Sequence, residues 1–254
     1  MVIYSYDGSF PGLLTVVFHI YENKLWPDQI VAPGFNGLLF DKAIQIGTQE
    51  EQVIRVWEGI RRYGGMPTCE QLFHAYLSAV EGIEMLILEY LKKLFEEKNC
   101  IASNFSLDCV LKINQLEKKV LREAQRMLMF ARFEQAADGT WFAPLSPKYD
   151  VLPLITGHFK LRFSNQSWLI YDIPRGYGFF YNQKILEQVT IDNPTFNRVS
   201  GNLKSEVQHP DEDKWQELWK SYFKQIAIAE RKNLRCQQNF MPKRFWKHLT
   251  EKKI

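Results

Sequence analysis

Apolar residues recur at every third or fourth position through most of the first half of the chain, a spacing typical of amphipathic helices. Ser9, followed two places later by Pro11, predicts the start of the first helix. The apolar face of that helix consists of Leu13, Leu14, Val17, Phe18 and Tyr21. The segment 25–46 is mixed and contains Pro27, Pro33 and Gly34, so we expect a loop with a short strand there.

Three longer helices are predicted to follow. Thr48 and Glu51 form a capping-box pattern before the first of them, and Gly64-Gly65 should end it. Thr68 and Gln71 repeat the pattern before a helical run over about 69–98. A further helix is predicted over about 106–133, with three arginines toward its end.

The sequence pattern changes from helical spacing to strand and turn signals at Ala136. Asp138-Gly139 is a dipeptide typical of hairpin turns. The segment 150–163 fits either an alternating strand or a helix with Asp150 as its cap and Pro153 in its first turn, and the helix is favoured. The sequences SWLIYDI and YGFFYN predict two strands around an IPRG turn.

The last part of the chain predicts a long loop over 192–212 and a helix over about 212–232. Trp215 and Trp219 share the apolar face of this helix, and we expect both in the core. The fold class is thus α+β: a mostly helical body, a small antiparallel β-sheet and a basic helical C-terminus. The expected regions are 1–135 helical, 136–190 hairpin and small sheet, and 191–254 loop and basic helix, within one compact domain 1–254.

The composition excludes several classes of protein. The chain has 254 residues, 46% of them hydrophobic, but no window of about 18 apolar residues, so no membrane span is expected. No basic region precedes an apolar one near Met1, and the four cysteines are scattered. We therefore expect a cytoplasmic protein with reduced thiols, without a metal or cofactor. The sequence contains no recognised catalytic motif that would identify a reaction. Its absence favours a binding protein over an enzyme.

Charge is distributed unevenly. The net charge is only +3, yet residues 220–254 hold ten basic side chains against two acidic ones. An excess of eight positive charges in one segment predicts an anionic partner, with nucleic acid the common case. The alternative is a solvated helix face.

His158 and Arg162 are the first candidate site residues, because a separation of four places them on one face of a helix or a strand. Asp172 and Arg175 follow across a short loop. His158 could transfer a proton, Asp172 could orient it, and either arginine could bind phosphate. The alternative is an Arg175–Asp172 ion pair that fixes the turn, with His158 at the surface.

Two further patterns have both a structural and a functional interpretation. Gly176 and Gly178 indicate a turn and a close backbone approach, and the aromatic residues 177, 179 and 181 either fill the core or stack bases. The C-terminal cations alternate with aromatic residues, which suits a phosphate backbone with adjacent bases or a clamp with its aromatics inward. The cations concerned are Arg231, Lys232, Arg235, Lys243, Arg244 and Lys247.

Three stretches, YDGSFPGLLTVVF, HFKLRFSNQSWLIYDIPRGYGFFY and QNFMPKRFWKHL, occur in the order found in a bacterial family. The chain resembles this family from Tyr4 to Leu249. The family is catalogued as a domain of unknown function and described in terms of DNA metabolism and DNA repair. Its members are often encoded beside a radical-SAM protein, and related domains are fused to uracil-DNA-glycosylase-like modules. The matching polar positions are Asp7, His158, Arg162, Asp172, Arg175, Lys243 and Arg244.

The resemblance implies a cytoplasmic protein that works on DNA, and it transfers no catalytic residues. Our first hypothesis is an accessory protein that binds DNA and serves a radical-SAM partner. Its DNA-binding residues would be Arg162, Arg175, Arg231, Arg235, Lys243, Arg244 and Lys247. The alternatives are a nuclease or base-processing enzyme centred on His158, Asp172 and Arg175, and an adaptor that binds another protein.

Overall fold

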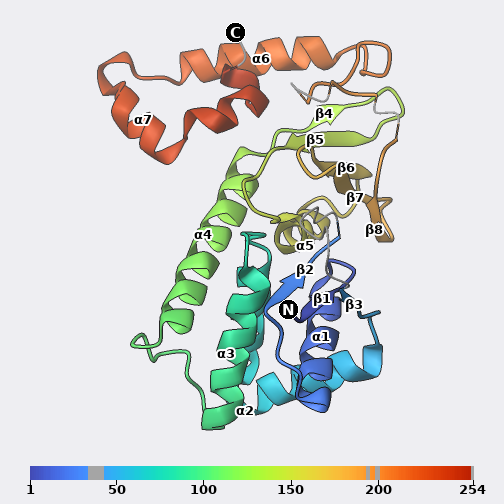
Figure 1. The fold of residues 1–254 in the computed structure, drawn as a ribbon. Coiled ribbons are helices and arrows are strands. Elements are labelled where there is room, and N and C mark those ends of the chain that lie inside the picture. The colour runs from blue at the N-terminus through green and yellow to red at the C-terminus, as the bar shows by residue number, and fades with distance from the viewer. Residues whose placement is uncertain (34–42, 193–194, 198–200, 253–254) are drawn as a thin grey trace. The chain divides into compact units, whose positions relative to one another are not determined.

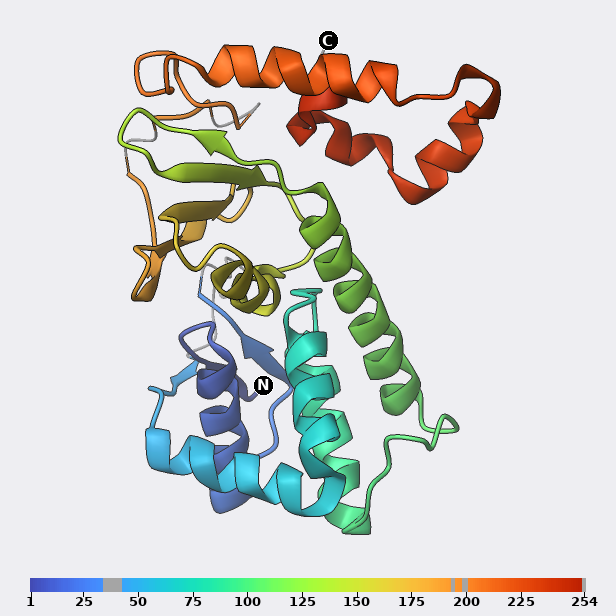
Figure 2. The same ribbon diagram turned by 180° about the vertical axis from the view of Figure 1, so that it is seen from behind.

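The computed structural model describes residues 1–33, 43–192, 195–197 and 201–252. The chain forms two compact units, Met1–Leu121 and Arg122–Ile254. The boundary between them falls inside the helix α4 (Asp108–Phe130), before residue 136, where the sequence pattern changes from helical spacing to strand and turn signals. Each unit has its own sheet and its own helices (Figures 1 and 2).

The first unit surrounds a short parallel sheet in the strand order β2-β1-β3. In chain order its elements are β1 (Ile3–Ser5), α1 (Phe10–Asn23), β2 (Gln29–Val31), β3 (Ile44–Gln45), α2 (Glu50–Tyr76), α3 (Ile83–Glu97) and the first part of α4. The sequence predicted α1 and one strand in the segment 25–46, of which residues 34–42 lie outside the described part of the chain, and it missed β1 and the sheet. These strands have only two or three residues, which is too short for an alternating pattern to show.

Local signals at the start of α1 are confirmed, whereas the predicted cap of α2 is wrong. The Ser9 hydroxyl accepts a hydrogen bond from the Gly12 N–H at 3.0 Å, as an N-cap should. The N-cap of α2 is Gln49, because the Thr48 hydroxyl donates to the Asp7 carboxylate at 2.6 Å instead. Asp7 also accepts from Ser9, so it has a structural role at the entry to α1.

Left-handed residues divide the helices of the first unit. Gly65, at φ 78° and ψ 173°, kinks α2 where the glycine pair predicted its end. The predicted single run over 69–98 is two helices, with Ala79 and Gly82 at positive φ between them. Both helices face the same core, so the apolar spacing continues across the break and does not reveal it.

The second unit contains a five-stranded sheet in the order β4-β5-β6-β7-β8. After α4 its elements are β4 (Glu134–Gln135), β5 (Trp141–Leu145), α5 (Leu152–Arg162), β6 (Trp168–Asp172), β7 (Tyr177–Tyr181), β8 (Leu186–Val189), α6 (Glu212–Gln225), η1 (Ala229–Arg231), α7 (Leu234–Phe240), η2 (Lys243–His248) and η3 (Thr250–Lys252). The expected purely antiparallel sheet is wrong, because α5 crosses over between β5 and β6 and makes that pair parallel. The hairpin at Asp138-Gly139 and the β6–β7 pair are confirmed, and β8 was not predicted.

The helix favoured over residues 150–163 is confirmed as α5. Its N-cap is Val151, and the expected cap Asp150 instead accepts a hydrogen bond from the Tyr177 hydroxyl. Phe159 of α5 packs edge-on against Trp168, with ring centroids 6.3 Å apart. This contact holds α5 on the β6–β7 part of the sheet.

Both glycines of the turn after β6 have a backbone role. Gly176 has φ 72°, a conformation that side chains other than glycine adopt at a cost. A Cβ added to Gly178 would press against the Ile170 carbonyl oxygen and come within 2.7 Å of the Tyr171 ring. The close backbone approach inferred from the glycine pair is therefore confirmed at Gly178.

We predict that Gly178→Ala destabilises the second unit by about 1–3 kcal/mol, because a backbone carbonyl cannot move aside as a side chain can. Gly157→Ala is the control, since a Cβ at this position in α5 meets nothing within 4 Å. It should raise stability by about 0.5–1 kcal/mol, as alanine does in a helix interior. Urea unfolding measures the free energy of unfolding of both variants. Equal effects of the two substitutions would contradict the close approach of Gly178 to the Ile170 carbonyl.

Candidate functional site

The helix α6 has the reverse of the usual burial pattern. Its only buried residue is Glu212, although the structure describes the whole helix. Trp215 is 56% exposed and Trp219 is 41% exposed, so the expectation that both lie in the core is wrong. A helical apolar spacing shows which side chains share a face, but not whether another element covers that face.

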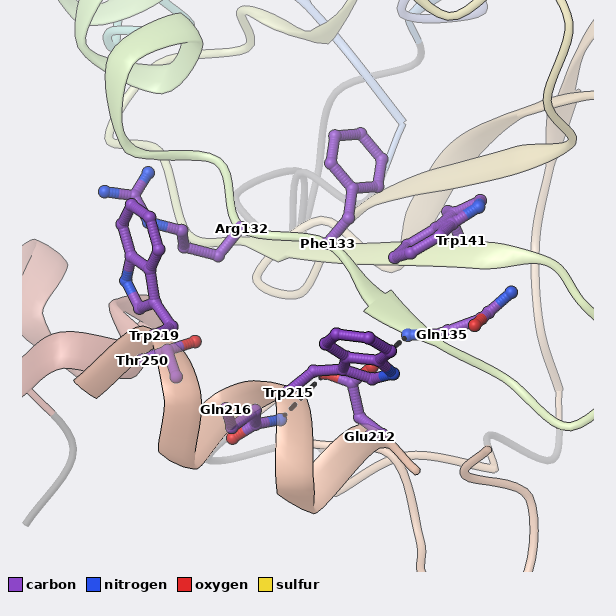
Figure 3. Close-up of a pocket in the computed structure, with 9 residues that line it drawn as sticks. All are labelled: Arg132, Phe133, Gln135, Trp141, Glu212, Trp215, Gln216, Trp219 and Thr250. Atoms are coloured by element: carbon purple, nitrogen blue, oxygen red, sulfur yellow. Dashed lines mark hydrogen bonds between the residues drawn. The ribbon is translucent and has the colours of Figure 1, made fainter. Parts of the chain in front are cut away.

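Glu212 joins α6 to the first strand of the sheet. One carboxylate oxygen accepts the backbone N–H of Gln135 in β4 at 3.0 Å, and the other accepts the Gln216 side-chain amide at 3.1 Å (Figure 3). The Gln135 carbonyl in turn accepts the backbone N–H of His209 at 2.9 Å. This network holds the start of α6 beside β4.

A cleft of about 720 Å³ lies between α6 and the β4–β5 hairpin (Figure 3). Trp141 of β5 lies on one side, and Trp215 and Trp219 of α6 lie on the other. The full lining is Arg132, Phe133, Gln135, Trp141, Glu212, Trp215, Gln216, Trp219 and Thr250. The spacing of 212, 215, 216 and 219 places the α6 members on one helix face.

One end of the cleft is fixed by Glu251, whose side chain is 2% exposed. Arg132 donates to it at 2.7 Å, and the Trp219 indole N–H donates to it at 3.0 Å. The Arg132 guanidinium also lies 6.0 Å from the centre of the Trp219 ring. Burial alone would raise the pKa of Glu251, but the hydrogen bonds from Arg132 and Trp219 hold it below its usual value. An ionised carboxylate therefore orients both Arg132 and Trp219.

The sequence pointed to cations, and it missed the three tryptophans of the cleft. A usable signal was the type of apolar residue in α6. The buried face of α3 is rich in leucine and isoleucine, whereas α6 presents tryptophan, tyrosine and phenylalanine between charged residues. Amphipathic aromatic side chains of this kind are enriched at binding surfaces.

Two of the seven arginines and lysines expected to bind nucleic acid have partners inside the protein. Arg244 forms a two-pronged ion pair with Glu123, whose side chain is 3% exposed. Arg175 donates to Asp172 and to the backbone carbonyls of Pro147 and Lys148. The other five are exposed and form no ion pair or hydrogen bond within the described residues: Arg162, Arg231, Arg235, Lys243 and Lys247.

Asp172 and Arg175 come together as expected, but His158 does not join them. The Asp172 side chain has no exposed surface, and it accepts the Arg175 guanidinium at 2.9 Å and the Arg175 backbone N–H at 3.1 Å. His158 is exposed on α5, and in the described structure it has no hydrogen bond to Asp172. The contacts of Asp172 and Arg175 therefore match the structural alternative, an ion pair that fixes the turn.

The aromatic residues near the C-terminus differ from those of α6. Phe245 is 3% exposed and packs on Phe130 with ring centroids 5.1 Å apart, and the Trp246 indole N–H donates to the Met241 carbonyl at 3.0 Å.

Within the described ranges, no group of three acidic, histidine or cysteine side chains is arranged to hold a metal ion. No described helix is long and apolar enough to cross a membrane.

We predict that Arg244→Ala destabilises the protein, because among the described residues it leaves buried Glu123 with the Lys148 backbone N–H, at 2.9 Å, as its one remaining donor. Breaking a buried pair costs about 3–5 kcal/mol, and this one should lie at the lower end because water screens the 40% exposed Arg244. Lys243→Ala, at an exposed neighbouring cation, should change stability by less than about 0.5 kcal/mol. Similar unfolding free energies for the two variants would refute the structural role of Arg244.

Arg175→Met should make stability more dependent on pH. Burial raises the pKa of Asp172 above its usual value, although the nearby Arg175 charge lowers it in part. A raised pKa in the folded state stabilises the fold at acidic pH, and this contribution is lost as pH rises through the folded-state pKa. Without Arg175 that pKa rises further, so the variant should lose progressively more stability than the parent from acid toward neutral pH.

The measurement for Arg175→Met is urea unfolding at several pH values from about 4 to about 7. The difference from the parent should reach about 3–5 kcal/mol at neutral pH, where Asp172 would be buried as an unpaired charge. The double variant Asp172→Asn/Arg175→Met has no titrating carboxyl at this site and should not show the steeper pH dependence. Parallel pH profiles for Arg175→Met and the parent would show that the ion pair contributes nothing.

Comparison with known proteins identifies a family but no activity. Neither the curated proteins nor the solved structures include a match to this chain. A family model described as a domain of unknown function, DUF4130, matches residues 81–251. The match covers well over half of the chain and includes every residue that lines the cleft, but not the N-terminal YDGSFPGLLTVVF stretch. The chain therefore belongs to the DUF4130 family of domains of unknown function.

Proposed function

We propose that this protein binds nucleic acid through its C-terminal segment and acts as an accessory protein in DNA metabolism or repair. The observation that supports this proposal most strongly concerns one segment, residues 212–252. Among the described residues, this segment combines exposed cations that form no ion pair with exposed tryptophans beside a cleft. Cations that neutralise phosphates, together with aromatic rings that stack on bases, are the two components of general binding to single strands.

The distribution of ion pairs supports this proposal. Arg244 of this segment and the nearby Arg132 each pair with a buried carboxylate, so both are neutralised within the fold. Arg231, Arg235, Lys243 and Lys247 have no such partner in the described part of the chain. Four exposed, unpaired positive charges within 17 residues favour an external polyanion by releasing its counterions.

The accessory role rests on the family resemblance. The absence of a catalytic motif in the sequence, and the internal pairing of Asp172 with Arg175, both favour binding over catalysis. In this proposal the protein holds DNA and presents it to a partner enzyme, such as a radical-SAM protein. The cytoplasm is where such a partnership would operate.

A protein-binding adaptor is the second candidate, and a separate observation favours it. Leu218 and Tyr222 of α6, and Ile226 at its C-cap, are each more than half exposed and do not line the cleft. Exposed apolar side chains on one helix are typical of a docking face for another protein. Salt separates the two candidates, because apolar docking weakens little at the ionic strength that disrupts phosphate contacts.

We predict that a labelled single-stranded oligonucleotide binds with an affinity that falls steeply between about 50 and 200 mM salt, with a logarithmic slope of about −0.7 per phosphate neutralised. Lys243→Ala/Lys247→Ala should reduce the magnitude of that slope by roughly 1.4, because two contacts are lost. The matched control is Lys118→Ala/Lys119→Ala, which removes two exposed cations of α4 outside the C-terminal segment.

Fluorescence anisotropy with single-stranded and duplex DNA measures these slopes, and far-ultraviolet circular dichroism confirms that each variant is folded. Absence of binding at about 50 mM salt by folded protein would refute the proposed function, since electrostatic contacts are strongest there. Equal slopes for the two double variants would place the contacts outside the C-terminal segment.

A further inference from the structure

Leu218, Tyr222 and Ile226 form an apolar ridge along α6. Their spacing of four residues places them in one row on the helix surface. They are 52%, 53% and 56% exposed, and none of them lines the cleft. In both views α6 lies at the outer edge of the second unit (Figures 1 and 2). The described chain therefore leaves more than half of each of these side chains in water.

The length of α6 indicates that an additional contact would stabilise it. Isolated helices shorter than about 12–15 residues are marginal in water, and protein helices gain most of their stability by packing an apolar face. The helix α6 has 14 residues, of which only Glu212 is buried. Towards its C-terminal end it is attached through Trp219, which donates to Glu251, and through Phe223, whose ring lies 5.1 Å from the Lys252 ammonium. The apolar ridge is the part of α6 that a partner would cover.

The charged side chains of α6 lie away from the apolar ridge. Two acids and two bases recur at helical spacing on the opposite face: Asp213, Glu217, Lys220 and Lys224. Nucleic acid requires cations at the contact surface, and helices that bind anionic lipid carry an excess of lysine and arginine on their polar face. The balanced charge of α6 supplies neither. The apolar ridge therefore suits an uncharged, apolar surface of a protein.

A second copy of the chain fits the apolar ridge, because the ridge reads the same in both directions. A two-fold interface uses the same patch on both subunits, so each contact occurs twice. A two-fold axis beside Tyr222 would bring the Tyr222 rings of the two copies together and set each Leu218 against the partner's Ile226. Ridges of residues four apart interdigitate in the commonest class of helix packing, at a crossing angle of about −50°.

The two-fold arrangement also keeps the cations of the two copies apart. Arg231 and Arg235 follow the C-terminal end of α6 and are exposed. Two parallel α6 helices would bring these cations together, and like charges that face each other oppose association. Around a two-fold axis the two helices are antiparallel, so their C-terminal ends and the cations beyond them point in opposite directions.

We propose that two copies of this protein associate through the apolar ridge of α6, with the helices antiparallel about a two-fold axis at Tyr222. The inference does not rest on the proposed nucleic-acid function, because the apolar ridge contains neither a residue of the cleft nor a cation. Three side chains bury much less than the roughly 800 Å² that each partner contributes to a standard interface. The dimer therefore belongs to the weak, concentration-dependent class, with a dissociation constant between about 1 μM and 1 mM.

Analytical ultracentrifugation without nucleic acid, and with a reductant, tests the association from about 5 μM to 1 mM protein. The average mass should rise from that of one 30.0 kDa chain towards twice that value. Tyr222→Asp sets two carboxylates against each other at the axis and should weaken association by at least about 10-fold. Glu217→Gln is the matched control, because Glu217 is exposed on the opposite face of α6, and it should associate as the wild-type protein does.

Disulfide crosslinking tests the two-fold arrangement. The background protein carries Cys100→Ser and Cys236→Ser, which remove the two exposed thiols. Tyr222→Cys in this background should form a linked dimer under mild oxidation, because a residue beside the axis meets its own copy within the about 4.4–6.8 Å between Cα atoms that a disulfide requires. Leu218→Cys should not, because antiparallel helices place the two copies of residue 218 on either side of the axis. Circular dichroism checks that each variant is folded.

The outcomes separate this inference from the proposed function. A folded protein that stays monomeric up to about 1 mM would overturn the dimer and leave nucleic-acid binding untouched. Undiminished association of Tyr222→Asp, or equal crosslinking of Leu218→Cys and Tyr222→Cys, would overturn the two-fold contact at Tyr222. A protein that dimerises as expected but does not bind a single strand at low salt would refute the proposed function alone.

Discussion

The buried carboxylate of Glu212 is the contact on which the candidate site depends. It accepts the backbone N–H of Gln135 and the amide of Gln216, and it is the only buried side chain of α6. Helices of globular proteins are normally held by an apolar face that excludes water. The start of α6 is attached to β4 through this hydrogen-bonded acid, and its tryptophans lie beside an open cleft instead of filling a core.

The same kind of contact recurs elsewhere in the second unit. Glu123 accepts Arg244, Glu251 accepts Arg132 and Trp219, and Glu134 accepts the backbone N–H of Leu203. Each of these acids is buried or nearly so. A buried carboxylate is unfavourable unless donors satisfy it, so each pair specifies one arrangement and does not simply add stability. Arginines used in this way are unavailable to phosphate, which divides the cations of the segment into structural and free groups.

Features encoded by neighbouring residues could be predicted from the sequence. The Ser9 cap, the Asp138-Gly139 hairpin and the helix α5 each depend on residues within one or two turns of one another. The parallel pairing of β5 with β6 depends on a crossover, and the Arg244–Glu123 pair joins residues 121 positions apart. No local pattern contains that information.

The candidate site was predicted in part for the same reason. Charge composition drew attention to the C-terminal segment, but it could not distinguish Lys243, which has no ion pair among the described residues, from Arg244, which is paired. The apolar spacing of α6 was correct, yet the conclusion drawn from it for Trp215 and Trp219 was wrong. Whether an amphipathic helix covers a core or faces a partner depends on the element that packs on it, and that is a property of the whole fold.

The central proposal is that the exposed tryptophans beside the cleft stack on the bases of a single strand. The most direct measurement follows the indole N–H resonances of the seven tryptophans by NMR while a single strand is added. Base stacking in the cleft predicts shifts at Trp215 and Trp219, with Trp26 and Trp57 of the first unit unchanged. Changes confined to backbone amides of the basic segment, with all seven indole resonances unmoved, would contradict it.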